Sequence, residues 1–388
     1  MRCLPRALLR LWIGALALAT ACSLRAGEPA AAAEPAWVPR LQAELAQVAQ
    51  RHSARIGVYV RDLDSGASAS FQADRPWYLA STVKVPVAIA VLRGVERGDF
   101  GLDTPLTLRA ADLVDGAGPT RLKPLGAPLT VRYLLEQMIV WSDNTASDML
   151  IGLVGIQAVN ALVQELVPGG FERITSLADV RRQAYGQLTP AAQHLSGSDF
   201  LALKQQRSEA ERRLLLARLV GVPASELKLP TLAAAYEAYY ATGLNTGRLD
   251  AYGELLARLV EGQALGPKGT AWLLRLMERV KTGPNRIKAG LPTRARFAHK
   301  TGTQRGRTCD AGVISVPRLG KDSRVLVAAC TSGELSVARS DRALREVGAA
   351  ICHSGLLTDG KPHDPLCNAV PRLSSDAASG GPDAPDEP

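Results

Sequence analysis

The sequence predicts an α+β fold: one five-stranded antiparallel sheet formed by N-terminal and C-terminal segments, flanked by helices, beside a separate helical lobe. Apolar residues alternate with other residues, the period of a strand, near both ends of the chain. Strands are expected at 55–62, 67–72, 296–303, 308–316 and 325–331. Helical spacing dominates the long interval between the second and third of these, and that interval supplies the lobe.

The first two strands have clear local signals. Apolar residues at helical spacing run from Val38 to His52 and predict a helix before the sheet begins. In the first strand Ile56, Val58 and Val60 alternate with other residues, so one face is apolar. The turn Asp64-Ser-Gly66 then separates this strand from the second.

The middle of the chain is mainly helical. A helix is expected over 81–97, and further helices over 104–170 are interrupted by a loop rich in Gly and Pro at 115–128. Helices return over 244–280, and a last helix over 340–353 closes the fold. Because the two parts of the sheet must meet across the lobe, we expect a cleft between lobe and sheet, a usual place for an active site.

Composition limits the classes of function. With 388 residues, of which 46% are hydrophobic and 21% charged, the chain can bury a large core in one to three structural domains. Its formal charge of +9 falls to about +6 once the first 22 residues, with three arginines and no acids, are removed. Basic runs interleaved with aromatic residues are absent from the sequence, which argues against nucleic acid and favours a small anionic substrate.

Residues 1–22 have the layout of a bacterial export signal. Arginines precede the apolar run Leu11 to Leu18, which is shorter than a membrane span. The string Leu18-Ala-Thr-Ala-Cys22 resembles the lipobox of bacterial lipoproteins, in which the cysteine is acylated. We therefore expect a monomeric exported protein that is either soluble in the periplasm or anchored by lipid at Cys22 to the outer membrane. Residues 372–388 are expected to be a disordered tail.

Four cysteines lie in the last quarter of the chain, which fits an oxidising compartment. Cys309 and Cys330 fall on neighbouring strands of an expected hairpin and are predicted to pair, as are Cys352 and Cys367, which would fasten the C-terminal segment. Their spacing matches no zinc pattern, and the five histidines are scattered. No metal and no cofactor is expected.

The string Ser81-Thr-Val-Lys84 places a hydroxyl and an amine three residues apart at a helix start, so both lie on one face. Lys84 can accept the proton of Ser81 when its amine is neutral, which burial and a nearby cation such as Lys300 favour. The N–H groups at the helix start, that of Ser81 first, would stabilise an oxyanion. An isolated S-x-x-K is more often a capping serine and a solvated lysine.

Two further strings complete the set. Ser142-Asp143-Asn144 interrupts a helical stretch: Ser142 is predicted to relay a proton between Lys84, Lys300 and the leaving nitrogen, and Asn144 to bind Lys84 and the substrate amide. A helix cap at Ser142 is the simpler alternative.

The third string, Lys300-Thr301-Gly302-Thr303, ends a strand. Lys300 and Thr301 are predicted to hold a substrate carboxylate, Gly302 to let backbone approach closely, and Thr303 to give the second oxyanion N–H. His299 beside Lys300 either tunes that lysine or only packs.

The chain also holds a second copy of two of these strings. Ser225-Glu-Leu-Lys228 repeats S-x-x-K, but it follows the only S-D-N. Lys281-Thr-Gly283 repeats K-T-G, but it runs into Pro-Asn, which is typical of a turn. We therefore place the chemistry on the first S-x-x-K and the second K-T-G.

In this order the three strings resemble those of class A β-lactamases, over residues 36–353. The segments Ile56–Gly66, Met138–Ala146 and Arg286–Pro292 are also similar to that family. The resemblance implies that Ser81 attacks a β-lactam carbonyl and that water then releases the acyl group. It also places Arg286 where some members bind the substrate carboxylate, although a surface arginine is the alternative.

One family element is missing. Class A enzymes release the acyl group with a glutamate in an E-x-x-L-N string, but the segment Ile174–Gln183 contains no glutamate, and Asp179 is its nearest carboxylate. Relative to the family, residues at about 183–244 form an insertion with an amphipathic helix near 209–219. The sequence therefore leaves three readings open: a β-lactam hydrolase, a D-alanyl-D-alanine peptidase or penicillin-binding enzyme acting on peptidoglycan stem peptides, and a non-catalytic binder of cell-wall fragments.

Overall fold

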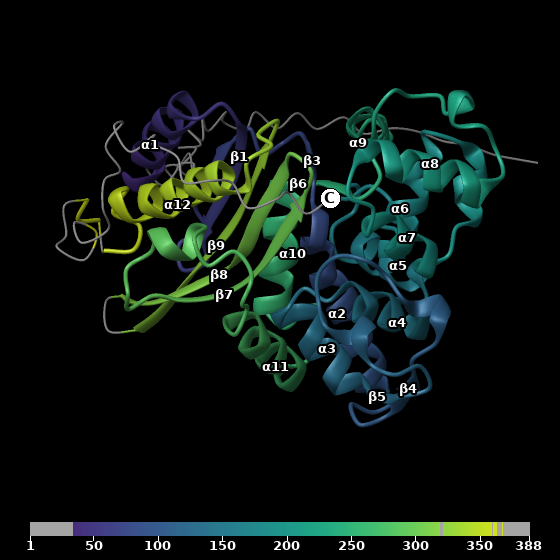
Figure 1. Cartoon of the computed structure of the whole chain (residues 1–388). Helices are drawn as coiled ribbons and strands as arrows, with labels where there is room; N and C mark the ends of the chain where they lie inside the picture. Colours follow the sequence, from purple (N-terminus) through teal and green to yellow (C-terminus); the bar gives the residue numbers. More distant parts are fainter. Residues whose placement is uncertain (1–33, 319–320, 359, 363–366, 368–388) are drawn as a thin grey trace, which may run out of the picture. The chain divides into compact units, whose positions relative to one another are not determined.

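The five-stranded antiparallel sheet predicted from the sequence is confirmed by the computed structural model, which describes residues 34–318, 321–358, 360–362 and 367. The strand order is β2-β1-β9-β8-β7 (Figure 1). Its strands are β1 (Arg55–Asp62), β2 (Ser68–Phe71), β7 (Arg296–Gln304), β8 (Arg307–Arg318) and β9 (Lys321–Ser332). Strand β1 pairs with β9 along its whole length, so the N-terminal hairpin joins the three C-terminal strands at one seam.

Both faces of the sheet are covered. Ile56, Val58 and Val60 are buried on one face in a cluster with residues of α1 (Trp37–Arg51) and α12 (Val337–His353). The opposite face packs against the helical lobe. Burial on both sides explains why β8 is buried over most of its length and why the middle of β9, from Val325 to Cys330, is continuously apolar, whereas a strand with one solvated face would alternate.

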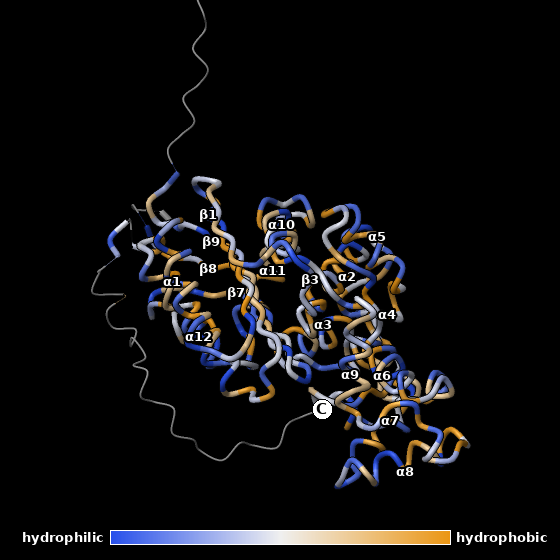
Figure 2. Tube along the Cα trace, turned by 90° about the horizontal axis from the view of Figure 1, so that it is seen from above, coloured by the Kyte–Doolittle hydropathy of each residue, from blue (hydrophilic) through white to orange (hydrophobic). Residues whose placement is uncertain are grey.

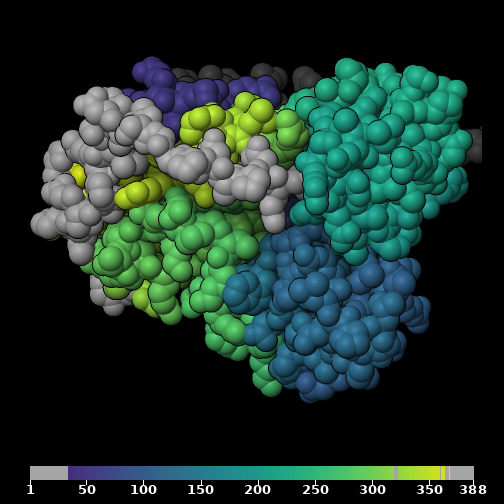
Figure 3. All heavy atoms as spheres, viewed as in Figure 1, coloured from purple at the N-terminus to yellow at the C-terminus, as the bar shows by residue number. Residues whose placement is uncertain are grey.

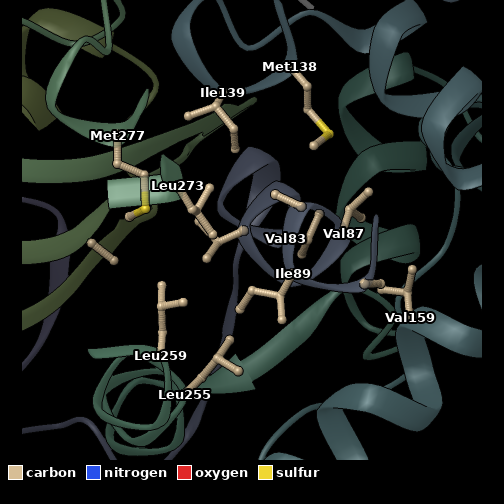
Figure 4. Packing of buried hydrophobic residues seen from close by; sticks show 14 of the residues in the cluster. Val83, Val87, Ile89, Met138, Ile139, Val159, Leu255, Leu259, Leu273 and Met277 are labelled. Atoms are coloured by element: carbon tan, nitrogen blue, oxygen red, sulfur yellow. The ribbon is translucent and has the colours of Figure 1, made fainter. Parts of the chain in front are cut away.

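The lobe surrounds α2 (Lys84–Arg97), whose residues from Lys84 to Leu92 are all buried. Figure 4 shows Val87 and Ile89 of this helix between apolar side chains of neighbouring helices. Those neighbours are α3 (Val131–Val140), α4 (Asn144–Val154), α5 (Ile156–Leu166), α10 (Leu249–Val260) and α11 (Pro267–Glu278). Small ladders pair β3 (Pro76–Tyr78) with β6 (Thr246–Arg248) and β4 (Pro105–Thr107) with β5 (Pro128–Thr130).

The helix predicted over 81–97 starts instead as a 3₁₀ turn, η1 (Ala80–Val83), and becomes α-helical at Lys84.

The segment 183–244 adds helices with their own apolar cluster. They are α6 (Leu177–Gly186), which enters the segment, α7 (Gly197–Lys204), α8 (Glu209–Val220) and α9 (Leu232–Tyr240), with 3₁₀ turns η4 (Pro190–His194) and η5 (Ala224–Glu226). The cluster includes Tyr236 and Tyr239 and reaches Tyr78 and Ala80, the first residue of η1. In Figure 3 these residues form one teal mass beside the blue residues of the lobe, and α6 contacts α4.

Along the trace in Figure 2, hydrophobic and hydrophilic residues are mixed within helices, as expected for helices with one buried face. Among the described residues, no single helix is long and apolar enough to cross a membrane; α4 and α5 pass that test only as a pair bent by 83°. Their apolar residues Met149, Leu150 and Val163 are buried in the lobe. The predicted signal at 1–22, Cys22 and the tail at 372–388 lie outside the described residues.

Both predicted disulfides are confirmed. Cys309 and Cys330 are direct partners across β8 and β9, and Cys352 at the end of α12 pairs with Cys367. The pairing of Cys309 with Cys330 follows from the register of the hairpin, because residues directly opposite in a ladder are close enough to be bridged.

The Cys309–Cys330 bond closes a loop with a sequence separation of 21 residues. By limiting the unfolded chain, such a bond stabilises a protein by about 3 kcal/mol. We therefore expect Cys309→Ala/Cys330→Ala to lower the free energy of unfolding by about 3 kcal/mol, measured by urea denaturation. An unchanged denaturation midpoint would contradict this.

Candidate active site

Ser81 lies in η1, where the lobe meets β7. The preceding residue, Ala80, has φ +46°, a conformation that is unfavourable for a residue with a side chain. A Cβ added at Gly302 of β7 would stand 2.6 Å from the Leu79 carbonyl oxygen and 3.1 Å from the Ser81 nitrogen. Only glycine therefore lets β7 pass this close to Ser81, as the sequence predicted for Gly302.

The Lys84 amine is buried and surrounded by oxygen atoms. Its Nζ donates to Asn144 Oδ1 at 2.8 Å, to Ser142 Oγ at 3.2 Å and to the Ser142 carbonyl oxygen. Burial lowers the pKa of Lys84 to about 7; Asp143 and Asp148 oppose this shift and Arg181 adds to it. At neutral pH a substantial fraction of this amine is therefore able to accept a proton.

Ser142-Asp143-Asn144 forms the turn between α3 and α4. Ser142 adopts φ +58°, and the helix cap is Asp143, not Ser142: its carboxylate accepts from the Ala146 N–H at 2.8 Å and the Thr120 N–H at 2.7 Å. The Ser142 hydroxyl is thereby left free for other partners. Asn144 Nδ2 donates to the Asp115 carbonyl oxygen at 2.7 Å, which fixes the amide with its oxygen toward Lys84.

Lys300 completes a chain of hydrogen bonds. Its buried Nζ donates to Ser142 Oγ and to the Thr301 carbonyl oxygen, both at 2.9 Å. Burial, together with the charges of Lys84 and Arg286, holds the pKa of Lys300 well below its usual value. The Ser142 hydroxyl thus lies between two amines of reduced basicity, an arrangement suited to passing a proton between them.

Arg286 is buried, with 3% of its surface exposed, so it is not a surface arginine. Its Nε donates to Asp341 at 2.7 Å, Nη1 to the carbonyl oxygens of Gly302 and Cys309 at 3.1 Å, and Nη2 to Thr303 Oγ1 at 2.7 Å. Most of its donors are thereby used to hold β7 and the Thr303 side chain.

Thr301 Oγ1 pairs with Thr282 Oγ1, a residue of the K-T-G copy that the sequence argument set aside. Thr282 therefore lies at the site, although the lysine of the site is Lys300 and not Lys281 of the triplet that contains Thr282. His299, beside Lys300 in sequence, is engaged with Asp310 Oδ1 at 2.7 Å and stacks on Phe297. These contacts favour the packing role of His299 over an effect on Lys300.

Sequence reasoning missed a buried ion pair beside Asn144. Arg181 Nε donates to Asp115 Oδ1 at 2.6 Å, and both side chains are 7% exposed. One signal could have found it: Ala178, Arg181 and Tyr185 follow the spacing of the buried face of α6, so an arginine stands where an apolar residue is expected. The next residue, Arg182, is partly exposed; it pairs with Asp179 at 2.8 Å and donates to the Leu195 carbonyl oxygen at 3.1 Å.

The segment that lacks the family glutamate leads into α6. Asp179 is 43% exposed in its ion pair with Arg182, which does not suit it to act as a base on an acyl group at Ser81. The N–H groups of Leu177 and Ala178 donate to the Asp148 carboxylate at 2.7 and 2.8 Å. Burial raises the pKa of Asp148 to about 6, against the lowering effect of these two hydrogen bonds. Asp148 therefore anchors α6 to α4, one turn beyond Asn144.

The lowered pKa of Lys84 sets an expected pH dependence. The neutral amine is the form that accepts a proton, and it predominates above pH about 7. We expect the second-order rate constant for acylation of Ser81 to rise between about pH 6 and 8 and then to level off. Stopped-flow acylation at a series of pH values measures this; a rate constant that falls across that range would contradict it.

Among the described residues there is no group of three or more His, Cys, Asp or Glu side chains that could hold a metal ion. The hydrogen bonds next to Ser81 join Lys84, Asn144, Ser142 and Lys300 to one another and Arg286 to Thr303, so the site offers alcohol, amine, amide and guanidinium groups. Among the described residues, no hydrogen bond links the Ser81 hydroxyl to Lys84 in this structure. These groups suit nucleophilic attack by Ser81 with proton transfer by a lysine.

Comparisons with known proteins show the family and the fold. The sequence model of the beta-lactamase enzyme family matches residues 40–354. Beta-lactamase ROB-1 of Haemophilus influenzae is 35% identical over 126 residues, 32% of this chain and only 40% of that protein. A beta-lactamase of Streptomyces albus G is 29% identical over 308 residues, which cover 76% of this chain and 79% of that protein.

Among solved structures, a mutant of PBP-A described as an acyl-enzyme complex with penicillin G superposes with a TM-score of 0.61 at 22% identity. The superposition covers 81% of this chain and 94% of that one, so it shows a shared fold. Since the family model spans most of the described residues, the chain belongs to the beta-lactamase enzyme family.

Proposed function

We propose that this protein is a serine hydrolase that opens the amide of a β-lactam through an acyl-enzyme on Ser81. The observation that carries this is the continuous chain of hydrogen bonds from Asn144 through Lys84 and Ser142 to Lys300, next to η1. It supplies a base of suitable pKa beside a serine and a proton path away from it.

In this mechanism neutral Lys84 takes the proton of Ser81 Oγ, which attacks the lactam carbonyl carbon. The oxyanion accepts from the backbone N–H groups of Ser81 and Thr303. The C–N bond then breaks, and the proton passes from Lys84 through the Ser142 hydroxyl to the leaving nitrogen. The nitrogen stays attached through the ring, so the acyl-enzyme carries the whole β-lactam until water cleaves the ester.

The substrate carboxylate would lie at the Lys300 end of the site. Lys300, Thr301 and Thr303 offer amine and hydroxyl donors there, with Arg286 behind them holding Thr303 in place. Because Arg286 already uses most of its donors, we assign it mainly to positioning, with any direct bond to substrate limited to its Nη2 atom.

The test is the intact mass of the purified protein after mixing with benzylpenicillin, combined with absorbance of a chromogenic cephalosporin. The proposal expects an increase equal to the whole penicillin, located on the peptide that contains Ser81, and loss of cephalosporin in excess of the protein. A permanent adduct without turnover would favour the penicillin-binding alternative, which is supported by the absence of the glutamate that activates water in class A enzymes. Unchanged mass with every β-lactam would contradict both and leave a non-catalytic binder.

Introducing a carboxylate at Ala178 is expected to speed release of the acyl group. Ala178 lies one turn from Arg181 on the same face of α6, and its N–H is held by Asp148, which acts electrostatically on Lys84. A glutamate there would place a base near Lys84. We expect Ala178→Glu to raise the deacylation rate constant about 10²-fold, and Ala178→Gln, of equal size, to leave it unchanged. Equal rates for the two variants would contradict this.

We also propose that the protein acts outside the cytoplasm. The two disulfides support this because such bonds persist in oxidising compartments. Mass spectrometry of the N-terminal peptide from membrane and soluble fractions tests whether the chain is cleaved near Cys22 and acylated there. An uncleaved N-terminus in the cytoplasmic fraction would contradict export.

A further inference from the structure

Arg181 stands at the end of the site opposite to Lys300. The hydrogen bonds run in order from Lys300 to Ser142, Lys84 and Asn144, and Arg181 lies beyond Asn144. A Cβ placed on Gly116 would be 2.6 Å from Asn144 Nδ2 and 3.5 Å from Arg181 Nη2, so these two nitrogens lie close together around one point. The glycine, with φ +95°, leaves the space between them open.

The protein holds this guanidinium in place from two sides. Asp115 accepts from its Nε at 2.6 Å, and the hydroxyl of Tyr236 on α9 accepts from Nη1 at 3.3 Å. The segment 183–244 therefore reaches the site through Tyr236. The side chain is 93% buried, since only 7% is exposed, so little freedom remains to be lost when a ligand binds.

The third nitrogen, Nη2, is left for a ligand. Within the part of the chain that the structure describes, Nη2 has no hydrogen-bond partner, because the two hydrogen bonds of Arg181 use Nε and Nη1. Unpartnered side-chain atoms that are shielded from solvent form a separate group, and Nη2 does not belong to it. It therefore keeps contact with solvent beside Asn144. A guanidinium fixed on two nitrogens and open on the third is suited to bind an oxyanion.

We propose that Arg181 recognises a negatively charged group on the acyl side chain of the substrate. Asn144, which is assigned to the substrate amide, lies between Arg181 and Lys84, so a group attached to the acyl side of that amide would extend toward Nη2. The inference rests on the proposed function and deepens it. The preferred substrate class is β-lactams or stem peptides with a carboxylate on the acyl side, in addition to the carboxylate held at the Lys300 end.

Benzylpenicillin and its α-carboxy derivative form a matched pair of probes, because they differ only by one carboxylate on the acyl side chain. The quantity measured is the ratio of their second-order rate constants for acylation, α-carboxy over benzyl. This ratio is taken within each variant, so a reduced folded fraction cancels. We expect Arg181→Gln to lower it about tenfold or more, the size of one charge-assisted hydrogen bond.

Three further variants separate recognition from structural damage. Arg181→Lys keeps the positive charge but loses the planar guanidinium with its several N–H donors, so it should lower the ratio less than Arg181→Gln does. Asp115→Asn removes the charge that neutralises Arg181 and should raise the ratio, the opposite direction. Arg182→Gln is the control: Arg182 is bonded to Asp179 and to the Leu195 carbonyl oxygen and not to Asp115 or Tyr236, so its loss should leave the ratio unchanged.

The outcomes distinguish this inference from the proposed function. If benzylpenicillin acylates Ser81 and Arg181→Gln leaves the ratio at the wild-type value, the inference is wrong and the function stands. If neither penicillin acylates the wild type, the function fails, and calorimetric titration of both penicillins then decides the inference. Tighter binding of the α-carboxy compound, lost in Arg181→Gln, would support it; equal or absent binding would overturn it.

Discussion

Ser81→Ala is expected to abolish formation of the penicillin adduct and to reduce kcat/KM for a chromogenic cephalosporin by about 10⁴-fold or more. The substitution removes the only atom that forms the covalent bond, while the helix start and its N–H groups remain. Residual turnover can come only from the oxyanion donors and from binding. Intact-mass measurement and steady-state absorbance together report the two effects.

The chain contains its own control for this experiment. Ser225 begins the second S-x-x-K and lies exposed in η5, away from the lysines of the site. The Ser225→Ala variant should form the penicillin adduct and hydrolyse the cephalosporin like the wild type. An adduct that survives in Ser81→Ala, or disappears in Ser225→Ala, would show that the nucleophile has been placed on the wrong motif.

Lys84→Met is expected to lower the acylation rate constant by about 10² to 10⁴-fold, the range for loss of a positioned general base. Methionine keeps much of the volume of the buried side chain but cannot accept the proton of Ser81. The rise in rate near pH 7 should also disappear, because the group whose pKa burial lowers to about 7 is gone. Stopped-flow acylation across pH measures both changes.

Lys228→Met, in the exposed second motif, is the matched control and should keep the wild-type rate and pH midpoint. Circular dichroism establishes that Lys84→Met is folded. A folded Lys84→Met protein that still acylates with an unchanged midpoint near pH 7 would assign the base to another group, with Asp148, of pKa about 6, the first to test.

Much of the fold could be read from periodicity. The strands β1 and β7 lie at nearly the predicted residues, and β1 shows the expected alternation of apolar residues. The hairpin register that pairs Cys309 with Cys330 follows from the strand positions. The start of the helix predicted over 81–97 was less predictable, because hydrophobic spacing does not distinguish the 3₁₀ turn at Ala80–Val83 from an α-helix. That distinction depends on β7 lying against the turn.

The sequence alone determined the chemistry offered by three short strings, their order, the two disulfides and the absence of a glutamate from Ile174–Gln183. Each of these is local or follows from one period along the chain. Only the tertiary structure decided that Arg181 is buried beside Asn144 while Arg182 is not, and that Thr282 meets Thr301. The lowered pKa of Lys84 belongs to this second group as well, because desolvation and charge act through space between groups that the chain keeps far apart until it folds.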